Sequence, residues 1–410
     1  MTSSTPYTIR WGIMATGGIA ETFCRDLLTD PTARDVHDVS HAIVAVASSS
    51  SSDRAAAFIG KIDGLASARA YGSYADLVAD PDVDIIYVAT PHSHHFQNAM
   101  LALTAGKNVL CEKALTVTAA QARKLVDMAR RENVFLMEAV WTRFFPLSVR
   151  VRELISSGEI GTVHRTMADL SLNFSSDPDD GKMTLADSHR MVNKHLAGGA
   201  LLDLGVYALT WVFQTLYHLQ QPSSASTTPS SPSSPLREAP AVLAAMDRYH
   251  TGADENTSII CHFPRTRAMG IATTSLRVGT SPHGQATAAP AIRIQGSQGE
   301  IQVAHPAYRP TSYRVLRRRG DGDGDVEVVE CPIPVDSKRG SWGHGMFWEA
   351  DECARCLRDG RKQSEVMPWE ESVVMMEVME EALRQGGVAY PDLITSDVFD
   401  AQSPLNTGTR

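Results

Sequence analysis

Over the first 140 residues, short apolar runs alternate with longer stretches in which apolar residues recur every three or four positions. The short runs indicate buried strands and the longer stretches amphipathic helices, an order typical of a parallel sheet covered by helices. The expected strands are Ile9–Met14, Ala42–Ala47, Asp84–Ala89, Asn108–Cys111 and Val134–Met137. The expected helices are Ile19–Leu28, Arg54–Ile59, Ser73–Val78, His95–Ala105 and Ala119–Arg131, with Thr118 as an N-cap and Gly106 as a helix end.

From Phe144 onward the pattern changes to strands that follow one another along the chain. Helices are expected at Leu147–Ser156, Gly198–Leu219, Met346–Arg358 and Glu370–Gln385. Strands are expected within Thr162–Asn173 and at Thr257–Phe263, Ala268–Val278, Ile292–Gln295, Glu300–Val303, Tyr313–Arg317 and Val326–Glu330. We therefore predict an α/β protein: a doubly wound parallel sheet over residues 1–140, and an α+β domain with a large, mostly antiparallel open sheet over residues 141–410. The Ser/Pro/Thr-rich stretch 221–240 is expected to be a surface insertion.

Composition and charge exclude several classes of protein. The formal net charge is −9 without a long basic run, which argues against nucleic acid or an anionic membrane as a partner. The N-terminus lacks the pattern of a signal peptide, and we expect no apolar run long enough to span a bilayer. The six scattered cysteines suit reduced thiols in a long chain. We therefore expect a globular cytoplasmic protein.

The first strand runs directly into a turn, Ala15-Thr16-Gly17-Gly18-Ile19, that opens the first helix. Backbone N–H groups in such a turn, together with the positive end of the helix, can hold a pyrophosphate. Gly17 stands where a side chain would block that approach, although Ala15 replaces the first glycine of the usual G-x-G-x-x-G/A pattern. A plain strand–turn–helix is the alternative, but the place of the turn at the start of a long βαβ series favours a dinucleotide site.

The end of the second strand indicates which dinucleotide binds. NAD enzymes usually carry an acidic residue there to bond the ribose hydroxyls, whereas this chain has Ser48 and Ser49, with Arg54 opening the next helix. Hydroxyls and a cation can accommodate a 2′-phosphate that a carboxylate would repel. Asp53 is interpreted as the N-cap of that helix rather than as a ribose ligand. The sequence therefore predicts NADP rather than NAD.

Polar residues follow three further strands, at the edge of the sheet where ligands bind in this architecture. The segments are Thr90-Pro91-His92-Ser93-His94-His95, Glu112-Lys113-Ala114 and Glu138-Ala139-Val140-Trp141-Thr142-Arg143. The three histidines invite a zinc interpretation, but no carboxylate stands at ligand spacing, so we expect no metal. A single lysine after a strand is more often a solvated surface residue, and the segments alone do not settle its role.

Three segments resemble those of a known family. The stretch 106–113, Gly-Lys-Asn-Val-Leu-Cys-Glu-Lys, closely resembles the G-K-x-V-x-x-E-K-P segment of the Gfo/Idh/MocA oxidoreductases, with Ala114 in place of the proline. Residues 141–144 and 198–207 extend the match, toward the branch that contains the dimeric dihydrodiol dehydrogenases and the fungal NADP-dependent D-xylose dehydrogenases. The likeness runs from about Arg10 to Pro391 and leaves out 221–240.

The resemblance implies a catalytic group of three side chains. Lys113 would bond the reacting oxygen and lower the pKa of Tyr207, which stands where many members of the family have histidine. Asp203 lies four residues earlier, so on a helix it shares a face with Tyr207. Oxidising an alcohol needs a base that takes the hydroxyl proton as the hydride leaves, and a neighbouring ammonium stabilises a phenolate. Without Lys113, a half-buried structural tyrosine would be the better interpretation.

Other residues acquire expected roles from the same resemblance. Thr90, Pro91, His92, His95 and Glu112 would line the cofactor site. Trp141 and Phe144 would be apolar walls for a ring-shaped substrate, although structural packing is nearly as well supported, and Asn173 would contact a substrate hydroxyl. Arg143 would bond cofactor or substrate, or alternatively pair with a core carboxylate.

The implied activity is NADP-dependent oxidation of a sugar or cyclic diol, with D-xylose and its lactone first and a cyclic trans-diol second. Two alternatives stay open: a cofactor-binding regulatory protein without turnover, and an elimination through a transient keto intermediate. The presence of both Lys113 and Tyr207 argues against the regulatory protein. The antiparallel sheet is expected to leave one face free, and such faces often join two subunits, so a homodimer is predicted.

Overall fold

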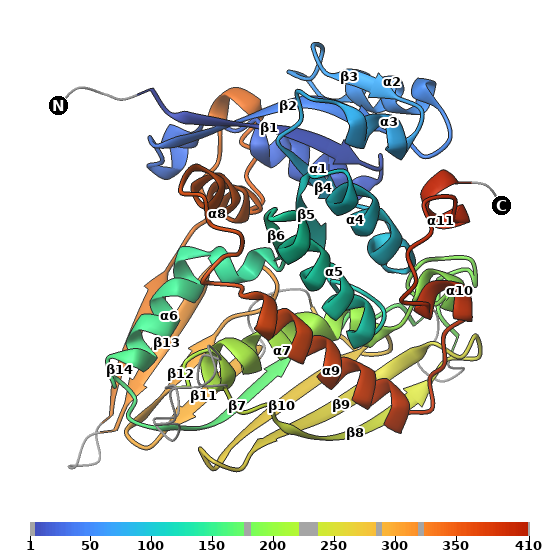
Figure 1. Ribbon diagram of the computed structural model, residues 1–410. Helices are drawn as coiled ribbons and strands as arrows, with labels where there is room; N and C mark the ends of the chain where they lie inside the picture. The colour runs from blue at the N-terminus through green and yellow to red at the C-terminus, as the bar shows by residue number, and fades with distance from the viewer. Residues whose placement is uncertain (1–4, 176–181, 221–236, 284–288, 319–323, 409–410) are drawn as a thin grey trace, which may run out of the picture.

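A six-stranded parallel sheet forms the N-terminal half of the protein in the computed structural model, which describes residues 5–175, 182–220, 237–283, 289–318 and 324–408 (Figure 1). The strand order is β3-β2-β1-β4-β5-β6, which confirms the predicted doubly wound α/β fold. The strands are β1 (Tyr7–Met14), β2 (Val39–Ala47), β3 (Arg69–Tyr71), β4 (Ile85–Val88), β5 (Asn108–Glu112) and β6 (Leu136–Ala139). The helices are α1 (Gly18–Leu27), α2 (Ser52–Lys61), α3 (Tyr74–Ala79), α4 (His95–Thr104) and α5 (Ala119–Glu132).

The helix ends test the predicted caps. Thr118 and Gln121 form a capping box at the start of α5, which confirms Thr118 as its N-cap. Gly106 follows α4 with a φ of +74°, as a C′ glycine should. The interpretation of Asp53 as an N-cap is wrong, because α2 begins earlier and Ser51 Oγ accepts the hydrogen bond from the Asp53 N–H.

The second half of the chain contains an eight-stranded sheet in the order β14-β13-β12-β11-β7-β10-β9-β8. Only β7 and β10 pair in parallel, so the predicted large, mostly antiparallel sheet is confirmed. The strands are β7 (Val163–Asp169), β8 (Ala241–Arg248), β9 (Asp254–Phe263), β10 (Ala268–Ser275), β11 (Ile292–Gly296), β12 (Gly299–Val303), β13 (Ser312–Arg317) and β14 (Asp325–Glu330). The alternation did not reveal β3 or β8, and most of the insertion 221–240 lies outside the described residues.

A long apolar helical segment packs on this sheet. Helix α7 (Val206–Val212) is flanked by π-helical turns at Leu201–Gly205 and Phe213–Tyr217. A Cβ on Gly270 of β10 would lie 2.2 Å from Val212 Cγ1, so the absence of a side chain there lets helix and strand approach closely. Contrary to expectation, Lys194–Tyr217 is long and apolar enough to span a membrane by length and composition, but 94% of that window is buried in the protein core.

Segments from the end of the chain return to the first sheet. The remaining helices are α6 (Pro146–Ser156), α8 (Phe347–Arg358), α9 (Trp369–Gln385), α10 (Asp392–Thr395) and α11 (Pro404–Thr407). Figure 1 shows α8 beside β1 and α11 beside α4, although both follow the second sheet in sequence. The carboxylate of Asp26 in α1 accepts hydrogen bonds from the indole of Trp342 and the backbone N–H groups of His344 and Met346.

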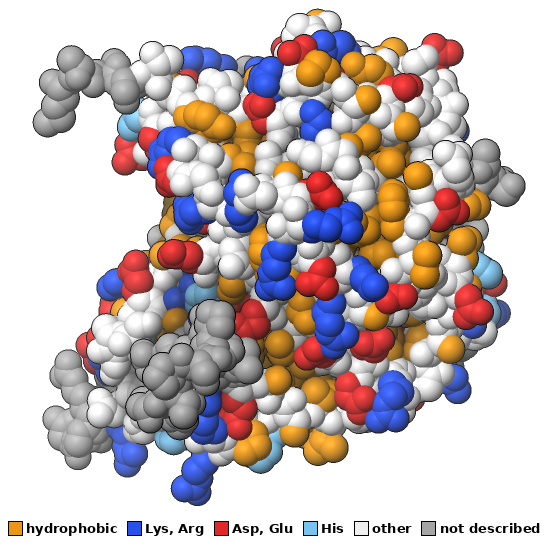
Figure 2. Space-filling model, viewed as in Figure 1, with side chains coloured by type: hydrophobic (Ala, Val, Ile, Leu, Met, Phe, Trp, Pro, Cys, Tyr) orange, Lys and Arg blue, Asp and Glu red, His pale blue; other side chains and the backbone are white. Residues whose placement is uncertain are grey.

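Basic and acidic side chains are interspersed on the face that carries α5 and α9 (Figure 2). Arg123 of α5 lies 2.5 Å from Glu377 of α9, and Arg130 and Asp127 pair along α5 itself. Exposed pairs of this kind contribute little to stability, typically about 0.2–1 kcal/mol each. They leave charges of both signs side by side over the helices that join the two halves.

Candidate active site

The turn after β1 presents backbone groups with space in front of them. Gly17 is the N-cap of α1, and no side chain satisfies the first N–H groups of the helix. A Cβ built on Gly17 or on Gly18 would meet no atom within 4 Å. Ala15 has a φ of +96°, a conformation that favours glycine, which explains why glycine is usual at this place in the pattern. The turn therefore fits the pyrophosphate of a dinucleotide.

The tip of β2 carries the residues expected at the adenosine ribose. Ser48 is buried at 5% exposure, Ser49 is half-buried, and Arg54 is exposed in the first turn of α2. Among the described residues Arg54 has no carboxylate partner within ion-pair distance, and a cation near a helix N-terminus opposes the helix dipole. An unpaired arginine beside two hydroxyls fits a ligand that brings its own negative charge.

The segment after β4 is held by its histidines. The two ring nitrogens of His95 lie 2.8 Å from the Ala114 carbonyl oxygen and 2.9 Å from that of Thr90, so this imidazole links the loop of Lys113 to the turn after β4. His92 lies with Nε2 3.8 Å from Asp203 Oδ1, and burial lowers its pKa to about 3. The buried Thr90 hydroxyl has no hydrogen-bond partner within the described part of the chain, so it is available to a ligand.

Lys113 and Asp203 meet at the carboxyl edge of the first sheet. The Lys113 ammonium lies 2.9 Å from Asp203 Oδ1 and 2.8 Å from the Asp203 carbonyl oxygen. Arg190 binds the same Oδ1 at 2.9 Å. Burial alone would raise the pKa of Asp203, but Lys113 and Arg190 outweigh it and hold that pKa well below its usual range. Because an ammonium has three donors, Lys113 retains one for a substrate oxygen.

Tyr207 lies against the same ammonium, in a different orientation from the one expected. Lys113 Nζ is 5.2 Å from the centre of the phenol ring, over its face, and Trp141 Nε1 donates a 2.6 Å hydrogen bond to the hydroxyl. Burial raises the pKa of Tyr207 well above 10 and Glu112 adds to this, while the Trp141 bond opposes both. The expectation of a lowered pKa is therefore wrong: burial is the dominant effect, and the ammonium is bonded to Asp203 rather than to the phenol oxygen.

The remaining predicted site residues have varied surroundings. Glu112 is buried and accepts a 2.5 Å hydrogen bond from the Tyr87 hydroxyl, and burial raises its pKa. Phe144 is buried in the turn that follows β6, the same turn that carries Trp141. Asn173 is exposed, and its Oδ1 accepts a hydrogen bond from the backbone of Ser175.

Arg143 lies in the interior and is fully buried. Its guanidinium pairs with Glu371, and it also bonds the Val366 carbonyl oxygen and His218. Of the two roles considered from the sequence, this geometry supports pairing with a core carboxylate rather than contact with cofactor or substrate.

Three further residues enter the cluster that the sequence motifs did not indicate. Arg190 reaches Asp203 from the segment before α7. The ring of His344 stacks on Trp141 with centroids 4.8 Å apart, and Tyr308 lies 5.9 Å from both Trp141 and Tyr207. All three come from irregular segments without a periodic pattern, so only the tertiary fold could reveal them.

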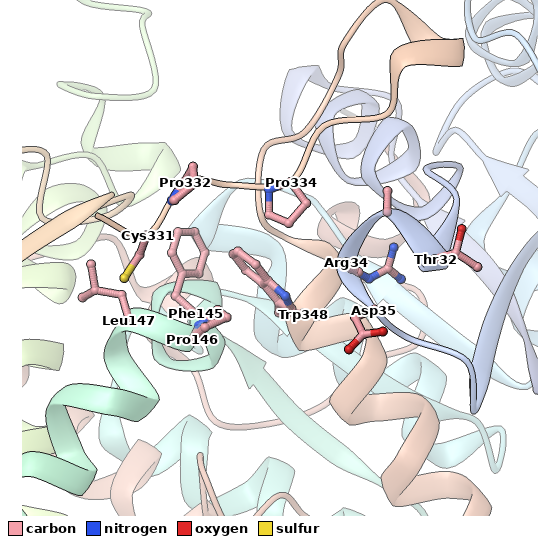
Figure 3. Close-up of a pocket in the computed structure, with 11 residues that line it drawn as sticks. Thr32, Arg34, Asp35, Phe145, Pro146, Leu147, Cys331, Pro332, Pro334 and Trp348 are labelled. Atoms are coloured by element: carbon pink, nitrogen blue, oxygen red, sulfur yellow. The ribbon is translucent and has the colours of Figure 1, made fainter. Parts of the chain in front are cut away.

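A separate cavity of about 460 Å³ opens next to this cluster (Figure 3). Its walls come from both halves of the chain, with Arg34 and Asp35 on one side and Phe145, Pro332 and Trp348 on the other. Phe145 lines the cavity and packs edge-to-face with Trp141, which in turn bonds the Tyr207 hydroxyl, so these two rings lie between the cavity and Tyr207. Neither Lys113 nor Tyr207 lines it, and it plays no part in the chemistry below.

Two family models match the chain. Residues 9–140 match the model described as "Oxidoreductase family, NAD-binding Rossmann fold", and residues 148–302 match the "GFO/IDH/MocA C-terminal domain". Among curated proteins, the D-xylose 1-dehydrogenase (NADP⁺) of Hypocrea jecorina is 63% identical over 410 residues, which is the full length of both chains. The trans-1,2-dihydrobenzene-1,2-diol dehydrogenase of Homo sapiens is 33% identical over 383 residues, covering 93% of this chain and 98% of its own.

Solved structures support the same fold at much lower identity. A levoglucosan dehydrogenase in complex with NADH and levoglucosan aligns with a TM-score of 0.73 and 17% identity, covering 93% of this chain and 97% of its own. The aldose–aldose oxidoreductase from Caulobacter crescentus aligns with a TM-score of 0.68 and 19% identity, over 93% and 98% of the two chains.

Proposed function

The chain belongs to the Gfo/Idh/MocA family of oxidoreductases, and from this we propose that it is an NADP-dependent dehydrogenase that oxidises D-xylose to its lactone. The observation that carries the proposal is the meeting of Lys113, Asp203 and Tyr207 at the carboxyl edge of the parallel sheet. The full-length identity of 63% to a D-xylose 1-dehydrogenase (NADP⁺) supports the choice of substrate.

In this proposal the chain's own residues bind and orient the alcohol and move one proton. The bound nicotinamide supplies a hydride acceptor for the carbon that carries the hydroxyl. Lys113 uses its remaining N–H to hold the substrate oxygen. The indole N–H of Trp141 donates to the Tyr207 oxygen and stabilises its phenolate form, and that phenolate takes the hydroxyl proton and becomes the neutral phenol. Asp203 positions the ammonium by accepting two of its hydrogen bonds.

The choice of NADP rests on the tip of β2. Ser48, Ser49 and the unpaired Arg54 would hold the 2′-phosphate, while the turn at residues 15–19 would hold the pyrophosphate. Thr90 and His92 would border the nicotinamide half of the cofactor. A comparison of kcat/KM for the two cofactors checks this choice: we expect a clear preference for NADP⁺, and a preference for NAD⁺ would contradict it.

A cyclic trans-diol is the second candidate substrate. The aromatic cluster of Trp141, Tyr308 and His344 favours it, because flat apolar side chains suit a carbocyclic ring. The experiment is a panel of aldoses and cyclic diols with NADP⁺, followed by the absorbance of NADPH. We expect D-xylose to give the highest kcat/KM. A higher kcat/KM for the diols would make a cyclic trans-diol the favoured substrate. No turnover with any compound of the panel would favour a regulatory protein.

We also propose that the protein is a cytoplasmic homodimer joined through the open face of the eight-stranded sheet. Leu243, Met269 and Val328 are 65%, 39% and 57% exposed on β8, β10 and β14. Apolar side chains on an open sheet face suit burial against a second copy. Light scattering should give twice the monomer mass, and Leu243→Glu combined with Met269→Glu should reduce it to the monomer mass. A wild-type protein that scatters as a monomer would contradict the dimer.

A further inference from the structure

The last segment of the chain, residues 392–408, lies along the N-terminal half, and we call it the C-terminal strap. Figure 1 shows it leaving the end of α9, passing through α10 and ending at α11 beside α4. Ile394 and Leu405 are buried at 2% and 7% exposure, whereas Leu393 and Val398 are more than half exposed. The strap is therefore held by a few buried side chains, while most of its other side chains are exposed or half-buried.

Side-chain amides of the Rossmann helices hold the strap by its backbone. Gln121 Nε2 donates to the carbonyl oxygens of Ile394 and Ser396, both at 2.9 Å. Gln97 donates to the Val398 carbonyl oxygen at 2.8 Å and accepts from the Asp400 N–H at 3.0 Å. All these bonds join the strap to the N-terminal half that contains the parallel sheet, although residues 141–391 separate the two in sequence.

Asn98 makes the anchor nearest the end of the strap. It is fully buried in the first turn of α4, and its Nδ2 donates to the Leu405 carbonyl oxygen and to Asn406 Oδ1, each at 2.9 Å. Asn406 Nδ2 in turn donates to the Asp400 carbonyl oxygen, a hydrogen bond within the strap that stabilises its last turn. Because both partners of Asn98 are acceptors, only a donor at this position satisfies them.

The strap ends against the tip of β2. A Cβ on Gly408 would lie 2.7 Å from Ser49 Oγ and 3.1 Å from the Ser49 carbonyl oxygen, and Gly408 has a φ of +69°. The backbone at Gly408 therefore touches one of the two serines assigned above to the ribose 2′-phosphate. The same strap contacts the turn His92–His94, which follows β4. Strand β1 lies between β2 and β4 in the sheet. The strap therefore contacts the chain after β2 and the chain after β4, on the two sides of the turn that follows β1.

We propose that the C-terminal strap forms the outer wall of the 2′-phosphate subsite and thereby determines affinity for NADP rather than for NAD. The inference rests on the proposed function, because it takes Ser49 as a cofactor residue. Docking of the strap by Gln97, Asn98 and Gln121 fixes Gly408 beside Ser49, which fixes the position of the serine hydroxyl. The strap is thus a positioning element that makes no contact with the reacting atoms.

Isothermal titration with 2′,5′-ADP and with ADP tests the proposal on the full-length protein without turnover. Gly408→Ala, which places a methyl group against Ser49, should weaken binding of 2′,5′-ADP about tenfold and leave ADP binding within about twofold. Asn98→Asp, which replaces a donor by an acceptor between two acceptors, should do the same. Gln402→Ala, an exposed strap residue whose side chain is not an anchor, is the matched control and should bind both ligands as the wild type does.

The outcomes separate this inference from the proposed function. Wild-type affinity for 2′,5′-ADP in both Gly408→Ala and Asn98→Asp would overturn the strap's role and leave the NADP assignment intact. Equal affinity of the wild type for 2′,5′-ADP and ADP would overturn the NADP assignment and the strap proposal together. Should Asn98→Asp prove unstable, Gly408→Ala alone decides, because Gly408 follows α11 and is exposed rather than part of the buried core.

Discussion

The two ends of the candidate active site are assembled in different ways. The cofactor turn consists of consecutive residues, 15–19, and presents backbone N–H groups at the start of one helix. The catalytic end collects Lys113, Trp141 and Arg190 from three separate segments and Asp203 and Tyr207 from one helical segment, and it works through side chains. A site made of local backbone depends mainly on the absence of side chains, whereas a side-chain cluster depends on the packing of the whole molecule. The two ends should therefore respond to substitution in different ways.

The largest effect is expected at the catalytic end. Tyr207→Phe removes the proton acceptor and should lower kcat by about 10²–10⁴-fold, the usual contribution of a general base. The cofactor end should not respond, so the Kd for NADPH measured by fluorescence should stay within about twofold of the wild-type value. Turnover at the wild-type rate would rule out the role of Tyr207.

The reverse pattern is expected at the cofactor turn. Gly17→Val places a side chain where no protein atom lies within 4 Å, and the φ of −83° at Gly17 suits valine. Folding should be unchanged, while the Kd for NADPH should rise about tenfold or more because bonds from backbone N–H groups to a charged phosphate are lost. Unaltered NADPH affinity would show that the cofactor does not approach Gly17. Thermal unfolding without cofactor serves as the control.

The pH dependence of turnover tests the role of Trp141. Oxidation needs the deprotonated phenol, and burial raises the pKa of Tyr207, so kcat for oxidation should rise with pH into the alkaline range. Trp141→Phe removes a donor that lowers this pKa, and the profile should move upward by about one pH unit, with an approximately tenfold loss at neutral pH. An unshifted profile would mean that the indole does not act on the phenol.

The smallest effect is expected on stability alone. Ala15 holds a φ of +96°, which costs a residue with a Cβ about 1–2 kcal/mol, while glycine loses more chain entropy on folding. Ala15→Gly should therefore raise the free energy of unfolding by about 0.5–1 kcal/mol with kcat unchanged. Denaturant unfolding measures this, and a destabilised variant would contradict the expected strain.

The sequence predicted most of the first sheet because its strands and helices alternate with a clear period. It missed β3, which has only three residues, and β8, whose burial alternates between exposed and half-buried positions. Within the site, the motifs indicated Lys113, Asp203 and Tyr207, and the structure brings them together. The motifs could not indicate that the Lys113 ammonium would bond Asp203 rather than the Tyr207 hydroxyl. Nor could they indicate that Trp141 would donate a hydrogen bond to that hydroxyl.

The return of residues 342–408 to the first sheet has a consequence for the making of the protein. Nascent domains generally fold as units from the N-terminus while the ribosome is still adding residues. Here α8 contacts β1 and β2, and the strap's amide anchors lie on α4 and α5, so these surfaces have no cover until the last part of the chain emerges. The N-terminal half therefore completes its packing only after residues 342–408 have been synthesised.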